Sequence, residues 1–143
     1  MDKATKLETL ETRLRRRIER KRGNVFLRAD FDDLGGYDQV GRALRAFVRR
    51  GQLIRVGQGL YVRAHPSLAN GEPVPVGGLN TLKQALRRVG IEALPSRFEQ
   101  AYNSGRTTQV PTGRVVGVTR RVRRKIGYGG FSLSFERVGQ GSH

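Results

Sequence analysis

One stretch of the chain restricts the fold more than any other. Apolar side chains recur at helical spacing over residues 37–50, and Gly51 ends the repeat. Two short, strand-like apolar runs follow at 53–56 and 60–63, and the loop Gly57-Gln58-Gly59 separates them. A three-residue loop with glycine at both ends is typical of a β-hairpin. This stretch therefore predicts an amphipathic helix followed by two paired strands.

The residues before this stretch predict two further helices. Residues 5–22 carry leucine and isoleucine at spacings of three and four, which gives one apolar stripe, and Gly23 ends that helix. After a short apolar run at 25–27, a short helix is expected at 30–34, and Gly35-Gly36 is expected to form a tight turn. The order helix, helix, turn, helix and hairpin is that of a winged helix-turn-helix, in which the helix after the turn enters the major groove of DNA.

The second half of the chain predicts a mixture of short elements. Helices are expected at 80–89 and 95–103, and strands at 114–119, 122–127 and 131–138. We expect a turn at Tyr128-Gly129-Gly130 to join the last two strands. Apolar and polar side chains alternate from Phe131 to Glu136, which fits a strand with one buried face.

Proline and glycine mark the expected domain boundary. Six residues of these two types lie between positions 66 and 78, where they disfavour both helices and strands. We therefore expect an α+β protein with a winged-helix domain at 1–65, a linker at 66–78, a small α/β module with a β-hairpin at 79–138 and a tail at 139–143.

The charge of the chain indicates the kind of partner that it binds. Lysine and arginine number 28 against 12 aspartates and glutamates, so the formal net charge is +16. Of these 28 basic residues, 23 are arginine. The planar guanidinium group suits phosphates and the edge of guanine better than an ammonium group does. The partner is therefore expected to be a polyanion.

Composition also excludes several classes of function. The chain has no cysteine and two histidines, so it cannot build a thiol nucleophile, a zinc finger or a multi-histidine metal site. Asp30, Asp32, Asp33 and Asp38 fit helix capping and first-turn charges, and we expect no metal, no cofactor and no enzyme activity. No run reaches 18 apolar residues and the first residues lack the apolar region of a secretory signal, so we expect a cytoplasmic protein without a membrane partner.

The expected helix at 37–50 has two contrasting faces. Val40, Leu44, Phe47 and Val48 fall within one arc, which predicts the face that packs on the core. The opposite arc is polar and basic, and in DNA recognition arginine binds the edge of guanine while glutamine binds that of adenine. The candidate base-reading residues are Asp38, Gln39, Arg42 and Arg45.

Phosphate contacts are expected from three further groups of residues, since such contacts position a protein on the duplex. They are Arg13, Arg16, Arg17 and Arg20 on the first helix; Arg49, Arg55, Gln58 and Arg63 at the end of the base-reading helix and on the hairpin; and Arg120, Arg121, Arg123, Arg124 and Lys125 in the second half. The last group has other interpretations, namely RNA binding, the docking of a protein partner, and charge that protects a strand edge.

The sequence also resembles a known family. The run "RKRGNVFLRADFDDLGGYDQVGRALRAFVRRGQLIRVGQGLYV" at residues 20–62 is similar to the N-terminal winged helix of AbiEi-type antitoxins of type IV toxin–antitoxin systems. The segments "TTQVP" at 107–111 and "RKIGYGGFSLSFERV" at 124–138 resemble the second domain of short members of that family. The resemblance implies a DNA-binding repressor of its own operon, with a nucleotidyltransferase-type toxin as a second partner.

Two functions remain open on the sequence. The residues favour sequence-specific binding of double-stranded DNA, with an inverted repeat as the expected target, by a transcriptional repressor that regulates its own operon. The alternative is a basic protein that binds RNA or the ribosome, for which the arginine-rich second half would serve equally well. A nuclease or nucleotidyl-transfer activity is disfavoured because the sequence offers no plausible active site.

Overall fold

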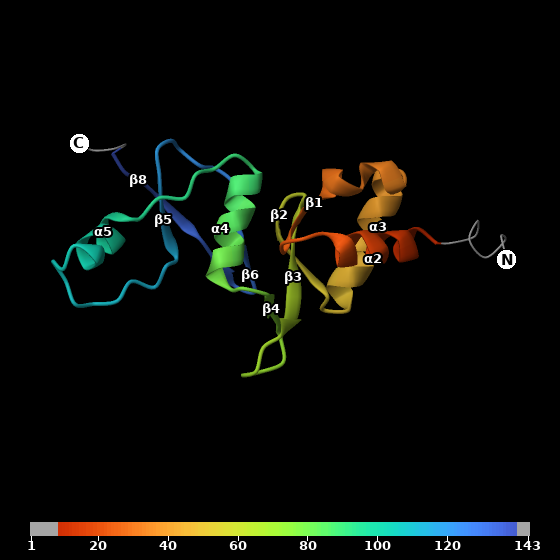
Figure 1. Ribbon diagram of the computed structural model, residues 1–143, viewed down its shortest axis with the longest axis horizontal. Helices are drawn as coiled ribbons and strands as arrows, with labels where there is room; N and C mark the ends of the chain where they lie inside the picture. Colours follow the sequence, from red (N-terminus) through yellow and green to blue (C-terminus); the bar gives the residue numbers. More distant parts are fainter. Residues whose placement is uncertain (1–8, 140–143) are drawn as a thin grey trace.

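The structure is a computed structural model that describes residues 9–139. It confirms the expected α+β class (Figure 1). The elements of the first half are α2 (Leu10–Arg20), β1 (Val25–Leu27), the 3-10 helix η1 (Arg28–Leu34), α3 (Tyr37–Arg49), β2 (Leu53–Gly57) and β3 (Leu60–Pro66). Those of the second half are β4 (Pro73–Pro75), α4 (Leu79–Arg88), α5 (Arg97–Asn103), β5 (Val115–Val118), β6 (Gly127–Tyr128), β7 (Phe131–Ser132) and β8 (Ser134–Arg137).

Helix α2 begins at a residue that favours a helix start but ends before the glycine that was expected to end it. Thr9 caps α2, because its hydroxyl oxygen accepts a hydrogen bond from the Thr12 amide at 3.1 Å. The helix ends at Arg20, earlier than expected, since Lys21 already has an extended backbone. Residues 5–8, where this helix was expected to begin, lie outside the described part of the chain.

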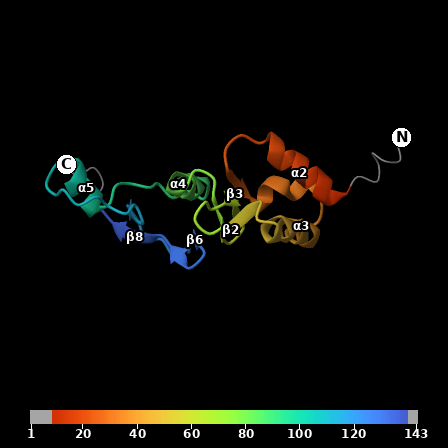
Figure 2. The same cartoon turned by 90° about the horizontal axis from the view of Figure 1, so that it is seen from below.

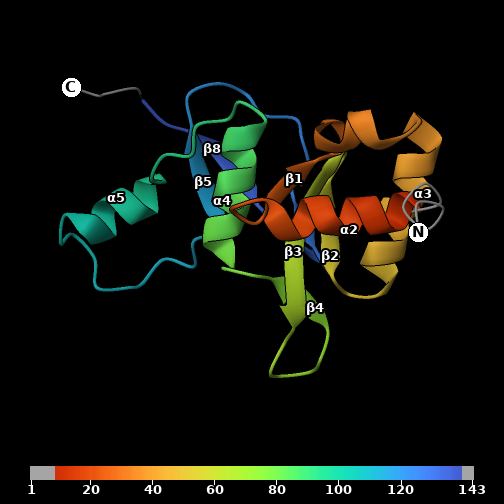
Figure 3. The same ribbon diagram turned by 45° about the vertical axis from the view of Figure 1, so that its right-hand side comes forward.

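A small antiparallel sheet occupies the centre of the molecule. Its strand order is β1-β3-β2, with β3 between the other two, and β4 pairs with the far end of β3. Tyr61 of β3 faces Phe26 on β1 and Arg55 on β2. Figure 3 shows the β3–β4 hairpin extending beyond the helices.

This sheet is buried on both faces. Side chains alternate along a strand, so Val25 and Phe26 point to opposite sides of β1. The helical core, on one side, consists of Leu14, Ile18, Phe26, Phe31, Val40, Leu44, Phe47, Leu53 and Tyr61. The shared core, on the other, consists of Val25, Ile54, Val56, Leu60, Val62, Leu82, Ala85, Leu86, Ile91, Val116, Val118, Ile126 and Leu133. The second half therefore packs directly on the sheet of the first half (Figure 1).

The expected linker at 66–78 is partly regular structure. It contains β4, which pairs with β3 from Ala64↔Pro75 to Pro66↔Pro73. The chain then turns into α4, where Leu82 and Leu86 are fully buried in the shared core. The segment consequently joins two parts of one hydrophobic core.

The strands of the second half differ from the expected ones in two places. The strand expected at 114–119 is present as β5, but of the one expected at 122–127 only the last residue, Gly127, lies in a strand. The strand expected at 131–138 is interrupted at Leu133, because β7 pairs antiparallel with β6 whereas β8 pairs parallel with β5. Leu133 donates its amide to Ile126 and Ser134 donates to Arg114, so the chain changes partner at this point.

Two local motifs in the second half form a tight turn and begin a helix. Gly129 and Gly130 both have positive φ, as the tight turn between β6 and β7 requires. Ser96 and Glu99 form a capping box at the start of α5. Among residues 9–139, none of the helices is both long enough and apolar enough to cross a membrane.

Candidate nucleic-acid interface

Helix α3 has one buried and one exposed face. Val40, Leu44 and Phe47 are between 0% and 3% exposed and lie in the helical core. The expected base-reading residues Asp38, Gln39, Arg42 and Arg45 are all exposed, as is Arg49 one turn further on. The structure thus brings this set together on one helix face. Within residues 9–139, Arg42 and Arg45 make no hydrogen bond or ion pair with the rest of the protein.

The beginning of α3 is held by a guanidinium group. Arg28 lies over the ring of Tyr37, 3.5 Å from its centroid, and also donates a hydrogen bond to the Tyr37 carbonyl. Gly41 makes room for this arginine, because a Cβ there would clash with Arg28 Nη2. Gln39 has a local role as well, since its side-chain oxygen accepts from the Gly36 amide at 3.4 Å. These contacts fix the first turn of the helix.

The end of α3 is held by an ion pair with α2. Arg50 Nη1 lies 2.6 Å from Glu11 Oε2, and its guanidinium lies 5.7 Å from the centroid of the Phe47 ring. The hydrogen bond from Arg50 is the main reason why the pKa of Glu11 is lowered from its usual value of 4.5. Both ends of α3 are therefore anchored, while its basic face is left exposed.

The β2–β3 hairpin presents a mixture of exposed and engaged side chains. Arg55 on β2 and Gln58 in the loop are exposed, as a phosphate contact requires. Arg63 on β3 is half-buried and donates to the carbonyls of Ile18, Lys21 and Gly23. It thereby satisfies carbonyl groups that the end of α2 leaves without partners. This structural role was not predicted from the sequence, where Arg63 directly follows the apolar run at 60–62.

The arginines of α2 lie apart from the exposed face of α3. Figure 2 shows α2 on one side of the molecule and α3 on the other. Arg17 is engaged inside the fold, since it binds Asp33 at 2.7 and 3.0 Å and also donates to the Asp30 carbonyl. The Arg17 hydrogen bond lowers the pKa of Asp33. Of the other predicted contacts on this helix, Arg13 is half-buried, and Arg16 and Arg20 are exposed.

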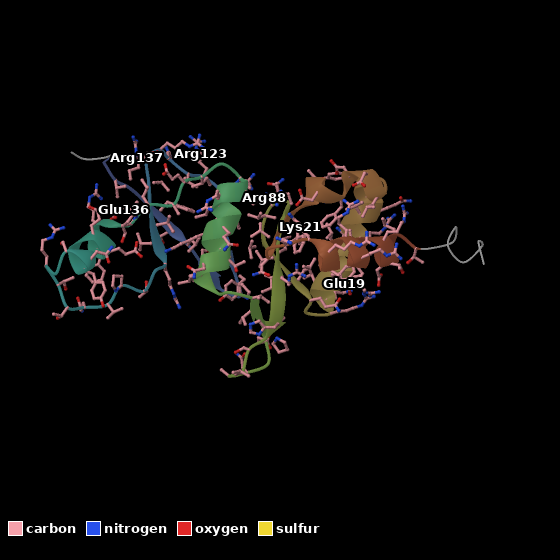
Figure 4. The ribbon with its side chains drawn as sticks, in the orientation of Figure 1. Glu19, Lys21, Arg88, Arg123, Glu136 and Arg137 are labelled. Carbon is pink, nitrogen blue, oxygen red and sulfur yellow. The ribbon has the colours of Figure 1, made fainter. Side chains whose placement is uncertain are left out.

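The basic run at 120–125 lies against the tip of the hairpin. Arg124 Nη1 donates to the carbonyl of Gln58 at 3.3 Å, and Arg120 donates to the Gly90 carbonyl at 2.9 Å. Arg121, Arg123 and Lys125 are exposed. Figure 4 shows Arg123 pointing away from the ribbon. The structure thus places part of this run beside Arg55 and Gln58, although they are far apart in the sequence.

Asp30 has a structural role in the fold. The Asp30 carboxylate accepts from the Leu27 amide at 2.9 Å, in agreement with the expected capping role. It also binds Arg88 of α4 at 2.8 Å and lies 3.9 Å from Lys21 Nζ. Figure 4 shows Arg88 at the edge of α4 that faces the first half. In the described part of the chain, histidine, aspartate and glutamate form no group of three or more that is placed to hold a metal ion.

Comparison with known families assigns the chain to a group without a known activity. Residues 13–140 match a family described as "Family of unknown function (DUF6088)". The chain belongs to this family. The match spans α3, the β2–β3 hairpin and the basic run, so the family includes both halves of the shared core. No curated protein and no solved structure matches the chain significantly.

Proposed function

We propose that this DUF6088 protein binds double-stranded DNA through α3 and acts as a transcriptional repressor of its own operon. The observation that carries the proposal is the two-sided character of α3. Its apolar side chains are buried in the helical core, whereas Gln39, Arg42 and Arg45 face the solvent together. An α-helix of ordinary diameter fits the major groove, where arginine and glutamine distinguish bases.

The arrangement around α3 supports a winged helix in the first half. A short helix and the Gly35-Gly36 turn precede α3, and the β2–β3 hairpin follows it. In the proposed winged helix this hairpin is the wing, and its exposed Arg55 and Gln58 would contact the DNA backbone beside the groove. Arg17 and Arg63 are left out of the proposed interface, because their guanidinium groups are hydrogen-bonded within the fold.

The shape of the exposed element favours DNA over duplex RNA. The major groove of A-form RNA is deep and narrow, and side chains on a helix cannot read it. An exposed basic helix face such as that of α3 matches the wider major groove of B-form DNA. The resemblance to AbiEi-type antitoxins supports the same assignment and adds self-regulation, with an inverted repeat upstream of the gene as the proposed target. A nucleotidyltransferase-type toxin is the proposed second partner on the same ground.

The proposal is tested by direct binding. Fluorescence anisotropy is measured with three labelled ligands: the DNA upstream of the gene, a shuffled duplex of the same length, and the corresponding RNA duplex. We expect the upstream DNA to bind most tightly, typically by a factor of at least about a thousand over the shuffled duplex at physiological salt. Equal or tighter binding of the RNA would contradict the proposal and favour the RNA-binding alternative.

A further inference from the structure

The tip of the β2–β3 hairpin and the basic run of the second half touch each other. Arg124 donates to the Gln58 carbonyl, and these residues are 66 positions apart in the chain. Gly57 lies so close to the run that a Cβ there would be 3.1 Å from both the Lys125 carbonyl oxygen and Ile126 Cδ1. Ile126 itself is fully buried in the shared core. The run is thus anchored beside the hairpin by a buried side chain.

A shallow, open depression lies at this junction. It has a volume of about 270 Å³ and is lined by Arg55, Val56, Gly57, Gln58, Lys125, Gly127 and Ser132. Two of these residues are cationic, one carries a hydroxyl group and another an amide, and none of those lining residues is acidic. We call this surface the junction site. Its donors match the requirements of a phosphate group, which accepts hydrogen bonds and attracts cations.

The two cations of the junction site have no anion within the protein. Arg55 and Lys125 are exposed, and among residues 9–139 neither side chain makes a hydrogen bond or ion pair. They come from opposite halves of the chain but line the same surface, and as like charges they repel each other. An external phosphate would relieve this repulsion and bind both groups.

The junction site also lies on the same side of the molecule as α3. Figure 2 shows α3, the end of β2 and β6 along one side, with α2 on the other. Strand β2 contacts α3 as well as β6, so it connects the helix with the second half on this side. A duplex bound to α3 would therefore run past the junction site.

We propose that the junction site binds a backbone phosphate of duplex DNA, held jointly by Arg55 and Lys125. This inference rests on the proposed function and assigns part of the second half to the same DNA-binding surface. The second half then lengthens the contact beyond the single groove that α3 occupies. Gly57 is the positioning residue of the junction site, since its lack of a side chain allows the run to approach the hairpin.

The test is a double-mutant cycle on a duplex of random sequence, with affinity measured over a series of salt concentrations. Arg55→Ala and Lys125→Ala should each reduce the slope of the logarithm of affinity against the logarithm of salt concentration by about one. If both residues hold one phosphate, the double variant should lose little more than either single variant. The matched control combines Arg55→Ala with Arg49→Ala, because Arg49 lies on α3 outside the junction site. In this control the losses of DNA affinity from the two substitutions should add.

A second variant changes geometry without changing charge. In Gly57→Ala the new methyl group would press on the Lys125 carbonyl and Ile126, so these neighbours must shift by a few tenths of an ångström. We expect weaker binding of the random duplex, with the fold verified by circular dichroism. Lys125→Arg should retain binding.

The two proposals fail in different ways. Wild-type protein that does not bind duplex DNA would overturn the proposed function. Wild-type protein that binds DNA, together with a Lys125→Ala variant that binds equally well, would overturn the junction site alone. Additive losses for Arg55 and Lys125 would likewise overturn a shared phosphate.

Discussion

Arg88 on α4 donates a hydrogen bond of 2.8 Å to the carboxylate of Asp30, and these two residues are 58 positions apart. Asp30 belongs to η1, so this ion pair connects the helical half of the protein with the second half. The same carboxylate accepts from the Leu27 amide and lies near Lys21. A single aspartate therefore holds together the end of α2, the start of η1 and α4.

Replacement of this aspartate should destabilise the fold. In Asp30→Asn the side chain keeps its shape but loses its charge, and we expect a loss of about 1 to 2 kcal/mol in the free energy of unfolding. The measurement is urea denaturation followed by circular dichroism. Asp32→Asn is the matched control, because Asp32 is exposed and its substitution should change little. Equal effects of the two substitutions would contradict the role of Asp30.

Stability should fall at acidic pH. Burial acts to raise the pKa of Asp30, but hydrogen bonds from Arg88 and the Leu27 amide outweigh it, so the pKa lies below its usual 3.8. The Arg17 hydrogen bond lowers the pKa of Asp33 in the same way. A carboxylate with a lowered pKa stabilises the folded state above its unfolded-state pKa, and this contribution disappears as the pH falls through the folded-state value.

The measurement for this prediction is the melting temperature as a function of pH. We expect a plateau above about pH 5 and a decline below about pH 4. The double variant Asp30→Asn with Asp33→Asn should have a lower plateau and a shallower decline. A decline as steep as that of the wild type would show that other carboxylates are responsible.

Removal of the arginines of α3 should reduce sequence preference. Arg42→Ala and Arg45→Ala should each cost about 1 to 3 kcal/mol of discrimination between the upstream DNA and a shuffled duplex. Arg55→Ala should weaken the binding of both duplexes by the same factor, because a phosphate contact carries no sequence information. Arg87→Ala is a charge-matched control on α4, outside the proposed surface. An unchanged preference in the first two variants would mean that another element reads the bases.

Binding to DNA should depend strongly on salt. If the protein neutralises on the order of 5 to 8 phosphates, the logarithm of affinity should fall against the logarithm of salt concentration with a slope of about −5 to −7. The slope is obtained by anisotropy titration of the wild-type protein at several salt concentrations. A slope near zero would be incompatible with a polyanionic partner.

Arg63 should be needed for stability rather than for DNA binding. Loss of its hydrogen bonds to the end of α2 in Arg63→Ala leaves three carbonyl groups without their donor, at a cost of about 2 kcal/mol in unfolding free energy. Arg63→Lys should not restore this stability fully, because lysine has one nitrogen, whereas Arg63 uses Nη2 for the carbonyls and Nε for the side-chain oxygen of Asn24. At a temperature where the variant is folded, its salt dependence should equal that of the wild type.

The sequence allowed accurate prediction where local pattern decides the structure. The apolar repeat of α3 and the glycines around its hairpin specify these elements without help from distant residues. The break at Leu133 could not be predicted in this way, because it arises when the chain exchanges β6 for β5 as its partner. Composition also cannot distinguish an exposed arginine such as Arg42 from one that is bonded internally such as Arg63.

One signal for the overall arrangement was present in the sequence. A strand with one solvent-exposed face alternates apolar and polar residues. The segments Val25–Leu27 and 60–62 are instead continuously apolar. Such runs indicate a strand that is covered on both sides. They predict that something must pack on the second face of the sheet, but not which part of the chain does so.

The central sheet is buried on both faces, and this limits which parts of the protein can be replaced without loss of the fold. The second half packs through Leu82 and Leu86 onto Val25 and Val62. It therefore cannot be exchanged for an unrelated domain as an independent unit. Any replacement for it would have to fit the same strand surface, and the other surface of those strands already supports α3. The exposed residues of α3 can therefore change without repacking of the core, whereas an exchange of the second half requires simultaneous repacking of the strands beneath α3.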